Sequence, residues 1–323
     1  MVKILLIGCG QLGIRYLQGF FNSHHEIMIQ IIDPSKLSKS NVDNLLSTNI
    51  DKTNKKYFFI DSIEEVCNDI SFAVIATSSN IRYKILEELV SKTQIKKIIL
   101  EKVLFQKEQE YFKALKLIKD NDIQCWVNHT RRMFPFYKKI REYLKNSKYF
   151  SFSVSGGSWG IACNALHFLD CIEFLSQSKI SLIDFSNLNK VLYPSKREGF
   201  LELNGLIAGK TNNVLFSLNS MENYSPVLIN ICSDDMHIII DESKNFYYIK
   251  GKSNNWDKFE YFEEKICYFQ SELSAILLED ILNNSCQLPE YEEAMELHLK
   301  FITPLIEYIN TFSENKYDYC PIT

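Results

Sequence analysis

The sequence predicts an α/β fold with two domains. The first is a doubly wound parallel sheet, and the second is an α+β domain built on a large, mostly antiparallel sheet. Over residues 1–128, short apolar runs alternate with helical stretches, whereas beyond residue 128 most runs show period-two alternation with turn residues between them. A length of 323 residues also favours two cores over one. We therefore expect domains at 1–128 and 129–323.

Six apolar runs predict the strands of the first sheet. They are residues 4–7, 27–32, 57–60, 72–76, 98–100 and 123–127. Helical stretches separate these runs, and this alternation is typical of a doubly wound sheet.

The second domain begins with a helix whose apolar side chains include Phe136, Ile140 and Tyr143. A strand at 150–154 and a helix at 166–175 follow. Four period-two runs then predict the antiparallel sheet, at residues 201–207, 213–218, 227–231 and 237–240. Helical spacing returns from about residue 267. Because the sequence has no repeat and no long linker, we expect the two domains to be joined closely.

Composition excludes several classes of protein. The chain is 46% hydrophobic and 24% charged, with a formal net charge of −4, so we expect no nucleic-acid partner. The first strand begins too early for a signal peptide, and no apolar stretch approaches the ~18 residues of a membrane span. These features predict a cytoplasmic protein without a membrane partner.

Cysteine and histidine spacing does not predict a metal site. The nine cysteines form no Cys-x-x-Cys pair, so we interpret them as reduced thiols in the core. The histidines outside the motifs described below also form no spaced set; they are His24, His25, His129, His237 and His298.

A glycine motif follows the first apolar run, in the order Gly8-x-Gly10-x-x-Gly13. Gly8 permits a tight turn, Gly10 lets the backbone approach a pyrophosphate, and Gly13 lets the next helix lie close to the strand. Backbone N–H groups at the start of that helix, at Gln11 and Leu12, would face the phosphates. The motif predicts a dinucleotide site. The alternative is an ordinary strand, turn and helix.

Asp33 ends the second apolar run, about 20 residues after the last glycine, where a carboxylate would accept from a ribose 2′-OH. A carboxylate repels a 2′-phosphate, so we expect NAD in preference to NADP. Ser35, Lys36 and Lys39 favour the opposite choice, since they could hold a phosphate. A purely structural role for Asp33 would be to cap the next helix.

Two further side chains have the chemistry of a dehydrogenase. Lys102 follows a strand at the edge where ligands gather, and its ammonium could bond a ribose hydroxyl and a reacting oxygen. His167 could take the hydroxyl proton as hydride leaves. The alternatives are a surface ion pair between Lys102 and Glu101, and a histidine that only packs in its helix.

Together these motifs resemble the glucose-fructose oxidoreductase, inositol dehydrogenase and MocA (Gfo/Idh/MocA) family along nearly the full chain. The stretches that carry the resemblance are the glycine motif with Asp33, residues 75–80, residues 100–103, Asn128 with Arg131 and Arg132, and residues 156–170.

The resemblance implies site residues beyond the glycine motif. At the cofactor it implies Thr77, Ser78, Asn80, Glu101 and Lys102. At the substrate it implies Asn128, Arg132, Trp159, Cys163, Asn164 and His167, with Lys102 and His167 catalytic.

The chain departs from the family pattern at two positions. Val103 stands in place of a proline, so the turn after Lys102 is expected to differ in geometry or to be strained. Cys163 stands four residues before His167, where the family commonly has a carboxylate, so the proton step is expected to be tuned differently. Asp170 matches the family's acidic position, and we interpret it as orienting His167.

The expected function is an NAD-dependent oxidoreductase acting on a sugar or nucleotide-linked sugar in surface-polysaccharide biosynthesis. The alternatives are a non-catalytic dinucleotide sensor or scaffold, and a reductase of a non-sugar carbonyl. The family's sheet commonly pairs with another copy, which implies a homodimer or homotetramer. A charged cluster at residues 196–200 with Glu202 is either an exposed hairpin or a substrate contact.

Overall fold

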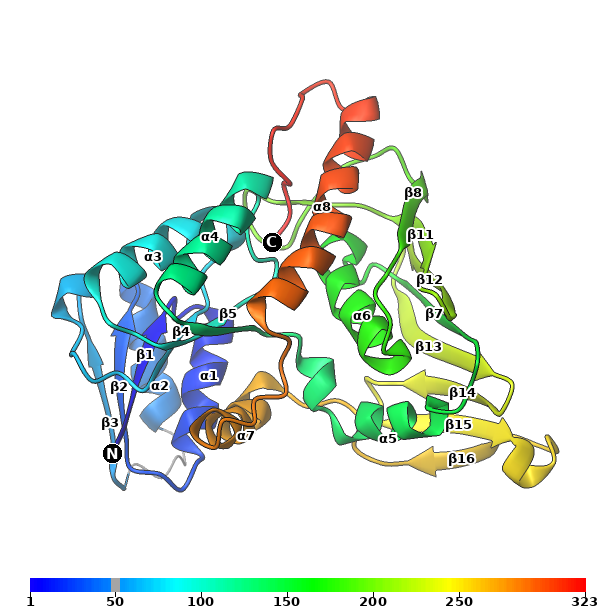
Figure 1. The fold of residues 1–323 in the computed structure, drawn as a ribbon, viewed down its shortest axis with the longest axis horizontal. Coiled ribbons are helices and arrows are strands. Elements are labelled where there is room, and N and C mark those ends of the chain that lie inside the picture. Colours follow the sequence, from blue (N-terminus) through cyan, green and yellow to red (C-terminus); the bar gives the residue numbers. More distant parts are fainter. Residues whose placement is uncertain (48–52) are drawn as a thin grey trace. The chain divides into compact units, whose positions relative to one another are not determined.

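The computed structural model describes residues 1–47 and 53–323, which form two compact units (Figure 1). The first unit contains residues 1–128 and 268–295, and the second contains residues 129–267 and 296–323. Within the described residues, no helix is both long and apolar enough to cross a membrane.

The first unit has a six-stranded sheet, and all of its strand pairs are parallel. The strand order is β3-β2-β1-β4-β5-β6. The strands are β1 (Val2–Ile7), β2 (Ile27–Ile32), β3 (Lys55–Phe59), β4 (Phe72–Ile75), β5 (Lys97–Leu100) and β6 (Gln124–Val127). The chain leaves β1 toward β2 and later returns to the other side of β1 at β4. Ligands of open α/β sheets bind at the carboxyl ends of the strands at this reversal.

Helices connect these strands, as the alternation of runs predicts. They are α1 (Gln11–Phe21), α2 (Lys36–Ser47), η1 (Ile63–Glu65), α3 (Ser79–Lys92) and α4 (Glu108–Asp120). All four residues of β4 are buried, which is why the strand is continuously apolar and not alternating. The predicted doubly wound parallel sheet is confirmed.

Residues 268–295 fold with the first unit, so the expected domain at 129–323 needs correction. Helix α7 (Gln270–Leu282) packs closely on α1, because Gly19 has no side chain: a Cβ there would lie 2.5 Å from the Cβ of Ser274. Val127 N–H also donates to the carbonyl of Pro289 at 3.0 Å. These contacts join segments far apart in the chain, which spacing along the sequence does not show.

The second unit is built on an eight-stranded sheet of order β16-β15-β14-β13-β7-β12-β11-β8. Of its described strand pairs, β7 with β12 is parallel and the others are antiparallel. The large, mostly antiparallel sheet is confirmed. Its strands are β7 (Phe150–Gly157), β8 (Leu182–Leu188), β11 (Gly205–Lys210), β12 (Val214–Met221), β13 (Ser225–Ser233), β14 (Met236–Asp241), β15 (Phe246–Gly251) and β16 (Glu260–Glu263).

The remaining elements of the second unit are short segments and helices. Two of them, β9 (Tyr193–Pro194) and β10 (Leu201–Glu202), form a separate ribbon. The run at 201–207 therefore belongs to two strands, the second of which begins at Gly205 with φ 113°, and is not the single strand that we expected. The helical elements are η2 (Thr130–Met133), α5 (Pro135–Leu144), α6 (Ile161–Ser176), η3 (Lys252–Asn254) and α8 (Tyr291–Phe312), which begins in the first unit.

Candidate functional site

The glycine motif forms the turn between β1 and α1, and two of its glycines are held by close backbone contacts. Gly8 has φ 88°, and a Cβ there would lie 2.9 Å from the backbone nitrogen of Thr77. A Cβ at Gly13 would lie 2.1 Å from the carbonyl oxygen of Gly8. A side chain at Gly8 would collide with the turn after β4, and a side chain at Gly13 would push α1 away from the end of β1. This is the packing role that the sequence predicts for Gly13.

Gly10 differs from the other two glycines because its Cα faces open space. Among the described residues, no atom lies within 4 Å of a Cβ built at Gly10. Gly10 is the N-cap of α1, where no side chain of the described chain caps the helix. The backbone N–H groups of Gln11 and Leu12 follow directly. An anion can therefore approach the helix N-terminus and its positive dipole end at this point.

Asp33 lies at the end of β2 and ties the glycine turn to that strand. Its Oδ2 accepts from Cys9 N–H at 2.5 Å, and its Oδ1 accepts from Ser35 N–H at 2.8 Å. The side chain braces the glycine turn and the residue before α2, which differs from the helix cap given above as its purely structural role. Each carboxylate oxygen has two acceptor positions, so both oxygens can still accept from ribose hydroxyls.

The turn after β4 adds hydroxyl groups beside the glycine turn. Thr77 Oγ1 is buried and has no hydrogen-bond partner among the described residues, although buried hydroxyls normally have one. Ser78 Oγ donates to Asn80 Oδ1 at 2.7 Å. The open Cα face, the uncapped helix, the acceptor at Asp33 and the buried hydroxyl fit a dinucleotide with its pyrophosphate at α1.

Lys102 follows β5, and its peptide bond with Val103 is cis. The fully buried Arg82 donates to the carbonyls of Thr77 and Val103, and to that of Leu104 at 2.8 Å. Arg82 therefore joins the turn after β4 to the turn that carries Lys102. Sequence reasoning missed this residue, because an arginine within a helix is normally exposed.

Glu101 and Asn128 are buried below these turns. The Glu101 carboxylate, 3% exposed, accepts from the hydroxyl of Tyr16 and from Asn128 Nδ2, both at 2.6 Å. Burial raises the pKa of Glu101 above its usual value, although these hydrogen bonds oppose the shift. Asn128 Nδ2 also donates to Gln270 Oε1 at 2.9 Å. The two residues therefore hold α1, α7 and the ends of β5 and β6 together; Glu101 is not the partner in a surface ion pair.

In the second unit, His167 lies in a group of three histidines. Its ring centroid is 5.6 Å from that of His129, which is 5.4 Å from that of His298. His129 and His298 are buried, whereas His167 is half-buried on α6. Sequence reasoning missed the group, because its members come from the N-cap of η2, from α6 and from α8. A positive charge on one of these imidazoles would oppose a charge on the next.

Arg132 and Asp170 form a buried ion pair beside this group. Arg132 Nε lies 3.0 and 2.9 Å from the two Asp170 oxygens, and Arg132 Nη2 lies 2.8 Å from Oδ1. We expected Arg132 to bind substrate and Asp170 to orient His167. In the structure each is engaged with the other, which fixes η2 against α6.

The first turn of α6 is held by Glu202 from β10. Its Oε1 accepts from Ala162 N–H at 2.5 Å, and its Oε2 accepts from Cys163 N–H at 3.4 Å. Burial raises the pKa of Glu202, while its hydrogen bonds to backbone N–H groups oppose the shift. The carboxylate thus lies at the positive end of the helix. The expected hairpin is present, since β9 and β10 pair antiparallel and residues 196–199 between them are exposed, whereas Glu202 is half-buried.

Trp159 and Asn164 complete this turn. Trp159 Nε1 donates to the carbonyl of Asn219 at 2.8 Å, and Asn164 Nδ2 donates to the carbonyl of Trp159 at 2.8 Å. Cys163 Sγ lies 4.0 Å from Ser195 Oγ. All three side chains are half-buried.

Comparison with protein-family models gives a match over residues 2–129, to the Gfo/Idh/MocA model described as an oxidoreductase family with an NAD-binding Rossmann fold. Over these residues the chain is similar to the Gfo/Idh/MocA family. No curated protein sequence matches the chain.

Several solved structures share the fold over both units. The UDP-N-acetylglucosamine 3-dehydrogenase of Acidithiobacillus ferrooxidans is 12% identical with a TM-score of 0.70, covering 95% of this chain and 98% of that one. An oxidoreductase from Agrobacterium radiobacter, in complex with NAD+, L-tartaric acid and magnesium, is 14% identical with a TM-score of 0.69 (93% and 94% covered). The transcriptional regulator Gal80p of Kluyveromyces lactis is 14% identical with a TM-score of 0.72 (96% and 92% covered).

The geometry clarifies both departures from the Gfo/Idh/MocA pattern. The bond before Val103 is cis although no proline is present. At Cys163 the chain has no carboxylate of its own, but Glu202 brings one to the same turn of α6 from another part of the sequence. The sequence shows a cysteine at position 163 in place of a carboxylate, and the fold brings the Glu202 carboxylate to the same turn of α6.

Proposed function

We propose that the protein is an NAD-dependent oxidoreductase that transfers a hydride to or from a carbinol carbon of a sugar or nucleotide-linked sugar. The open Cα face of Gly10 at the uncapped start of α1 carries this proposal, because it is shaped for a pyrophosphate. The oxidoreductase family model that matches residues 2–129 and the dehydrogenase among the similar folds support the same reaction class. NAD would supply the hydride acceptor or donor.

The cofactor preference follows from Asp33. Its carboxylate would accept from both hydroxyls of an adenosine ribose and would repel a 2′-phosphate. Ser35, Lys36 and Lys39 are exposed beyond it. We therefore expect tighter binding of NAD than of NADP.

We assign the proton step to His167 and polarisation of the reacting oxygen to Lys102. His167 is the most exposed of the three histidines, and a neutral imidazole there can accept a hydroxyl proton. Its ring lies next to that of the buried His129, which in turn lies next to that of the buried His298. We assign substrate contacts to Cys163 and Asn164 on the same helix and to Trp159 just before it.

The wider setting follows from the reaction class. We place the enzyme in the cytoplasm, in surface-polysaccharide biosynthesis, as a homodimer or homotetramer. A nucleotide-linked sugar is the form in which sugars enter such a route.

The experiment is a turnover screen with the purified chain. We expect NAD to bind in a calorimetric titration, and the absorbance of reduced nicotinamide to change with at least one nucleotide-linked sugar. Failure to bind NAD would contradict the proposal. Tight NAD binding with no turnover on any sugar would instead support a non-catalytic dinucleotide sensor; one protein of similar fold is a transcriptional regulator.

A further inference from the structure

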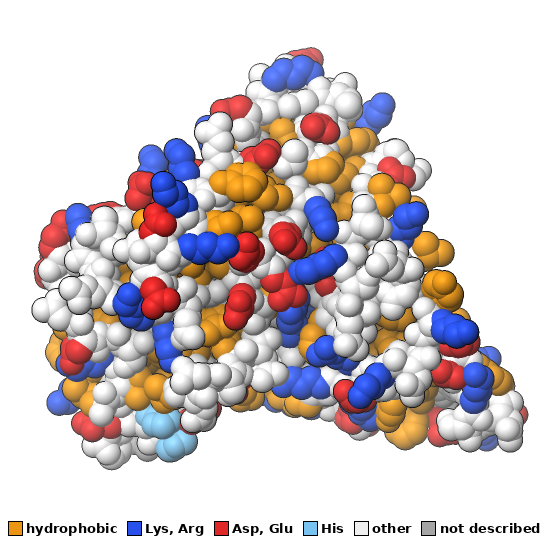
Figure 2. Space-filling model, in the orientation of Figure 1, with side chains coloured by type: hydrophobic (Ala, Val, Ile, Leu, Met, Phe, Trp, Pro, Cys, Tyr) orange, Lys and Arg blue, Asp and Glu red, His pale blue; other side chains and the backbone are white. Residues whose placement is uncertain are grey.

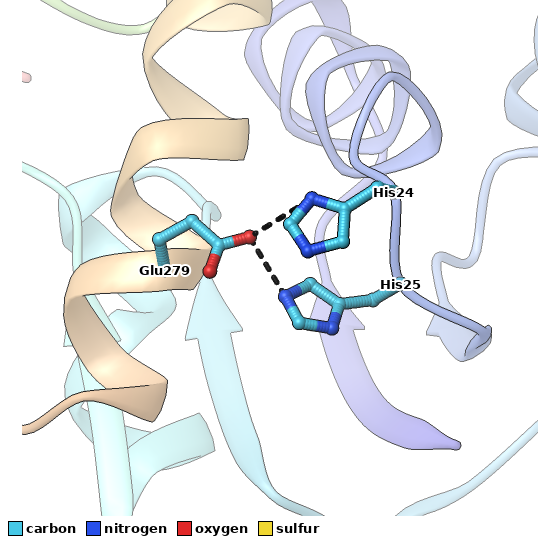
Figure 3. A group of neighbouring side chains, drawn as sticks. All are labelled: His24, His25 and Glu279. Atoms are coloured by element: carbon cyan, nitrogen blue, oxygen red, sulfur yellow. Dashed lines mark hydrogen bonds and ion pairs between the residues drawn. The ribbon is translucent and has the colours of Figure 1, made fainter.

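We propose that His24, His25 and Glu279 form a site for one divalent transition-metal ion of the zinc class. Figure 3 shows both imidazole rings turned toward one carboxylate oxygen. His25 Nε2 lies 2.7 Å and His24 Nδ1 lies 3.6 Å from Glu279 Oε1. One ligand atom from each of the three side chains lies within 4.8 Å of the others. The sequence predicted no metal site, because Glu279 lies in a distant part of the chain.

The distances fit a single ion after small side-chain movements. Zinc binds imidazole nitrogen and carboxylate oxygen at about 2.0–2.2 Å, so donor atoms around a tetrahedral ion are separated by roughly 3.4 Å. The observed separations lie on both sides of this value. The two rings are 4.2 Å apart with an interplanar angle of 33°, so neither ring blocks the other.

The backbone on both sides of the site is fixed. Lys55 Nζ donates to the carbonyls of Ser23 at 2.7 Å and His25 at 2.9 Å, which holds the turn between α1 and β2. Glu279 lies on α7, which packs tightly on α1 at Gly19. Two parts of one unit therefore present the ligands on braced elements.

The donor set determines the class of ion. Imidazole with carboxylate suits zinc and its neighbours in the transition series, whereas magnesium and calcium prefer oxygen ligands alone. The His24 side chain is 80% exposed and the Glu279 side chain 37%, so water can complete the coordination. A surface group of histidine side chains is visible in the space-filling view (Figure 2).

The bound ion would fasten α7 to the turn after α1. At its other end α7 carries Gln270, which accepts from Asn128, and Asn128 donates to Glu101. A metal at Glu279 would therefore stabilise the helix that supports the base of the dinucleotide domain. This role is independent of the reaction assigned to the protein.

The test uses the full chain without a histidine tag, after treatment with a chelator. Titration with Zn²⁺ should give one ion per chain. His25→Ala and Glu279→Gln should each lower the affinity by at least ~10-fold, because each removes a ligand. His237→Ala, which removes a histidine of the second unit, should leave the affinity unchanged. Zn²⁺ should also slow amide hydrogen exchange in residues 270–282 of the wild type but not of Glu279→Gln.

Several results would overturn the proposal. One is no Zn²⁺ binding to the wild type, and another is equal binding by Glu279→Gln, provided that circular dichroism shows the variant folded. A third concerns the nine cysteines. A sulfur-to-metal charge-transfer band with Co²⁺ would place the ion on thiolates and not on His24, His25 and Glu279.

Discussion

Gly10→Ala should separate cofactor binding from folding. A Cβ at Gly10 has no described atom within 4 Å, and the residue has φ −70°, which alanine adopts freely. Its only expected structural cost is that of a poorer N-cap residue, below about 1 kcal/mol. The same methyl group would stand where a pyrophosphate must approach the backbone, so we expect NAD affinity to fall by at least ~10-fold, or about 1.4 kcal/mol.

Gly13→Ala is the matched control. A Cβ there would lie 2.1 Å from the carbonyl oxygen of Gly8, so the backbone of the turn must move. Overpacking of this kind costs about 1–3 kcal/mol, and we expect a lower melting temperature together with weaker binding. Calorimetric titration with NAD and thermal unfolding measure the two effects separately. Unchanged NAD affinity in a folded Gly10→Ala variant would refute our placement of the pyrophosphate.

Other substitutions test the remaining assignments. Asp33→Ala should reduce discrimination against NADP, measured as the ratio of the two dissociation constants; tighter NADP than NAD binding by the wild type would refute the argument. Lys102→Ala and His167→Ala should each lower kcat/KM by at least ~100-fold without unfolding, and a near-wild-type rate would remove that residue from the mechanism. Cys163→Asp should place a second carboxylate beside Glu202, whose pKa is already raised by burial. When the pKa of a carboxyl group is higher in the folded than in the unfolded state, the free energy of unfolding falls as the pH rises from about 4.5 through the folded-state pKa. Cys163→Asp should therefore destabilise the protein more at pH 8 than at about pH 4. Adding Glu202→Gln should relieve this loss, because it removes one of the two carboxylates. Urea unfolding at the two pH values measures this, and a loss independent of pH would show that the carboxylates do not interact.

Much of the fold could be predicted because strands buried on both faces require apolar runs. Strand β4 is an example, with all of its residues buried. Strand β16 gave no such signal, since all of its residues are exposed and its sequence is Glu-Tyr-Phe-Glu. The membership of α7 in the first unit was also beyond reach, because it depends on the fit between Gly19 and Ser274.

Some features of the candidate site could also be predicted from the sequence, and others could not. The glycine motif could be found because three backbone constraints fall within six residues. The ion pair of Arg132 with Asp170 and the histidine group around His167 could not, since each joins different elements. A polar residue that matches a family motif can therefore hydrogen-bond to another residue of the protein, as Asn128 does to Glu101.

Transfer of isotope between cofactor and substrate tests the central claim most directly. The chain is incubated with NADH deuterated at the transferable position of the nicotinamide and with the keto form of a nucleotide-linked sugar, and the sugar product is analysed by mass spectrometry. We predict one deuterium on the carbinol carbon of the product, and incorporation that is at least ~100-fold slower with His167→Ala. Bound cofactor that never passes deuterium to any sugar would contradict the assignment as a sugar oxidoreductase.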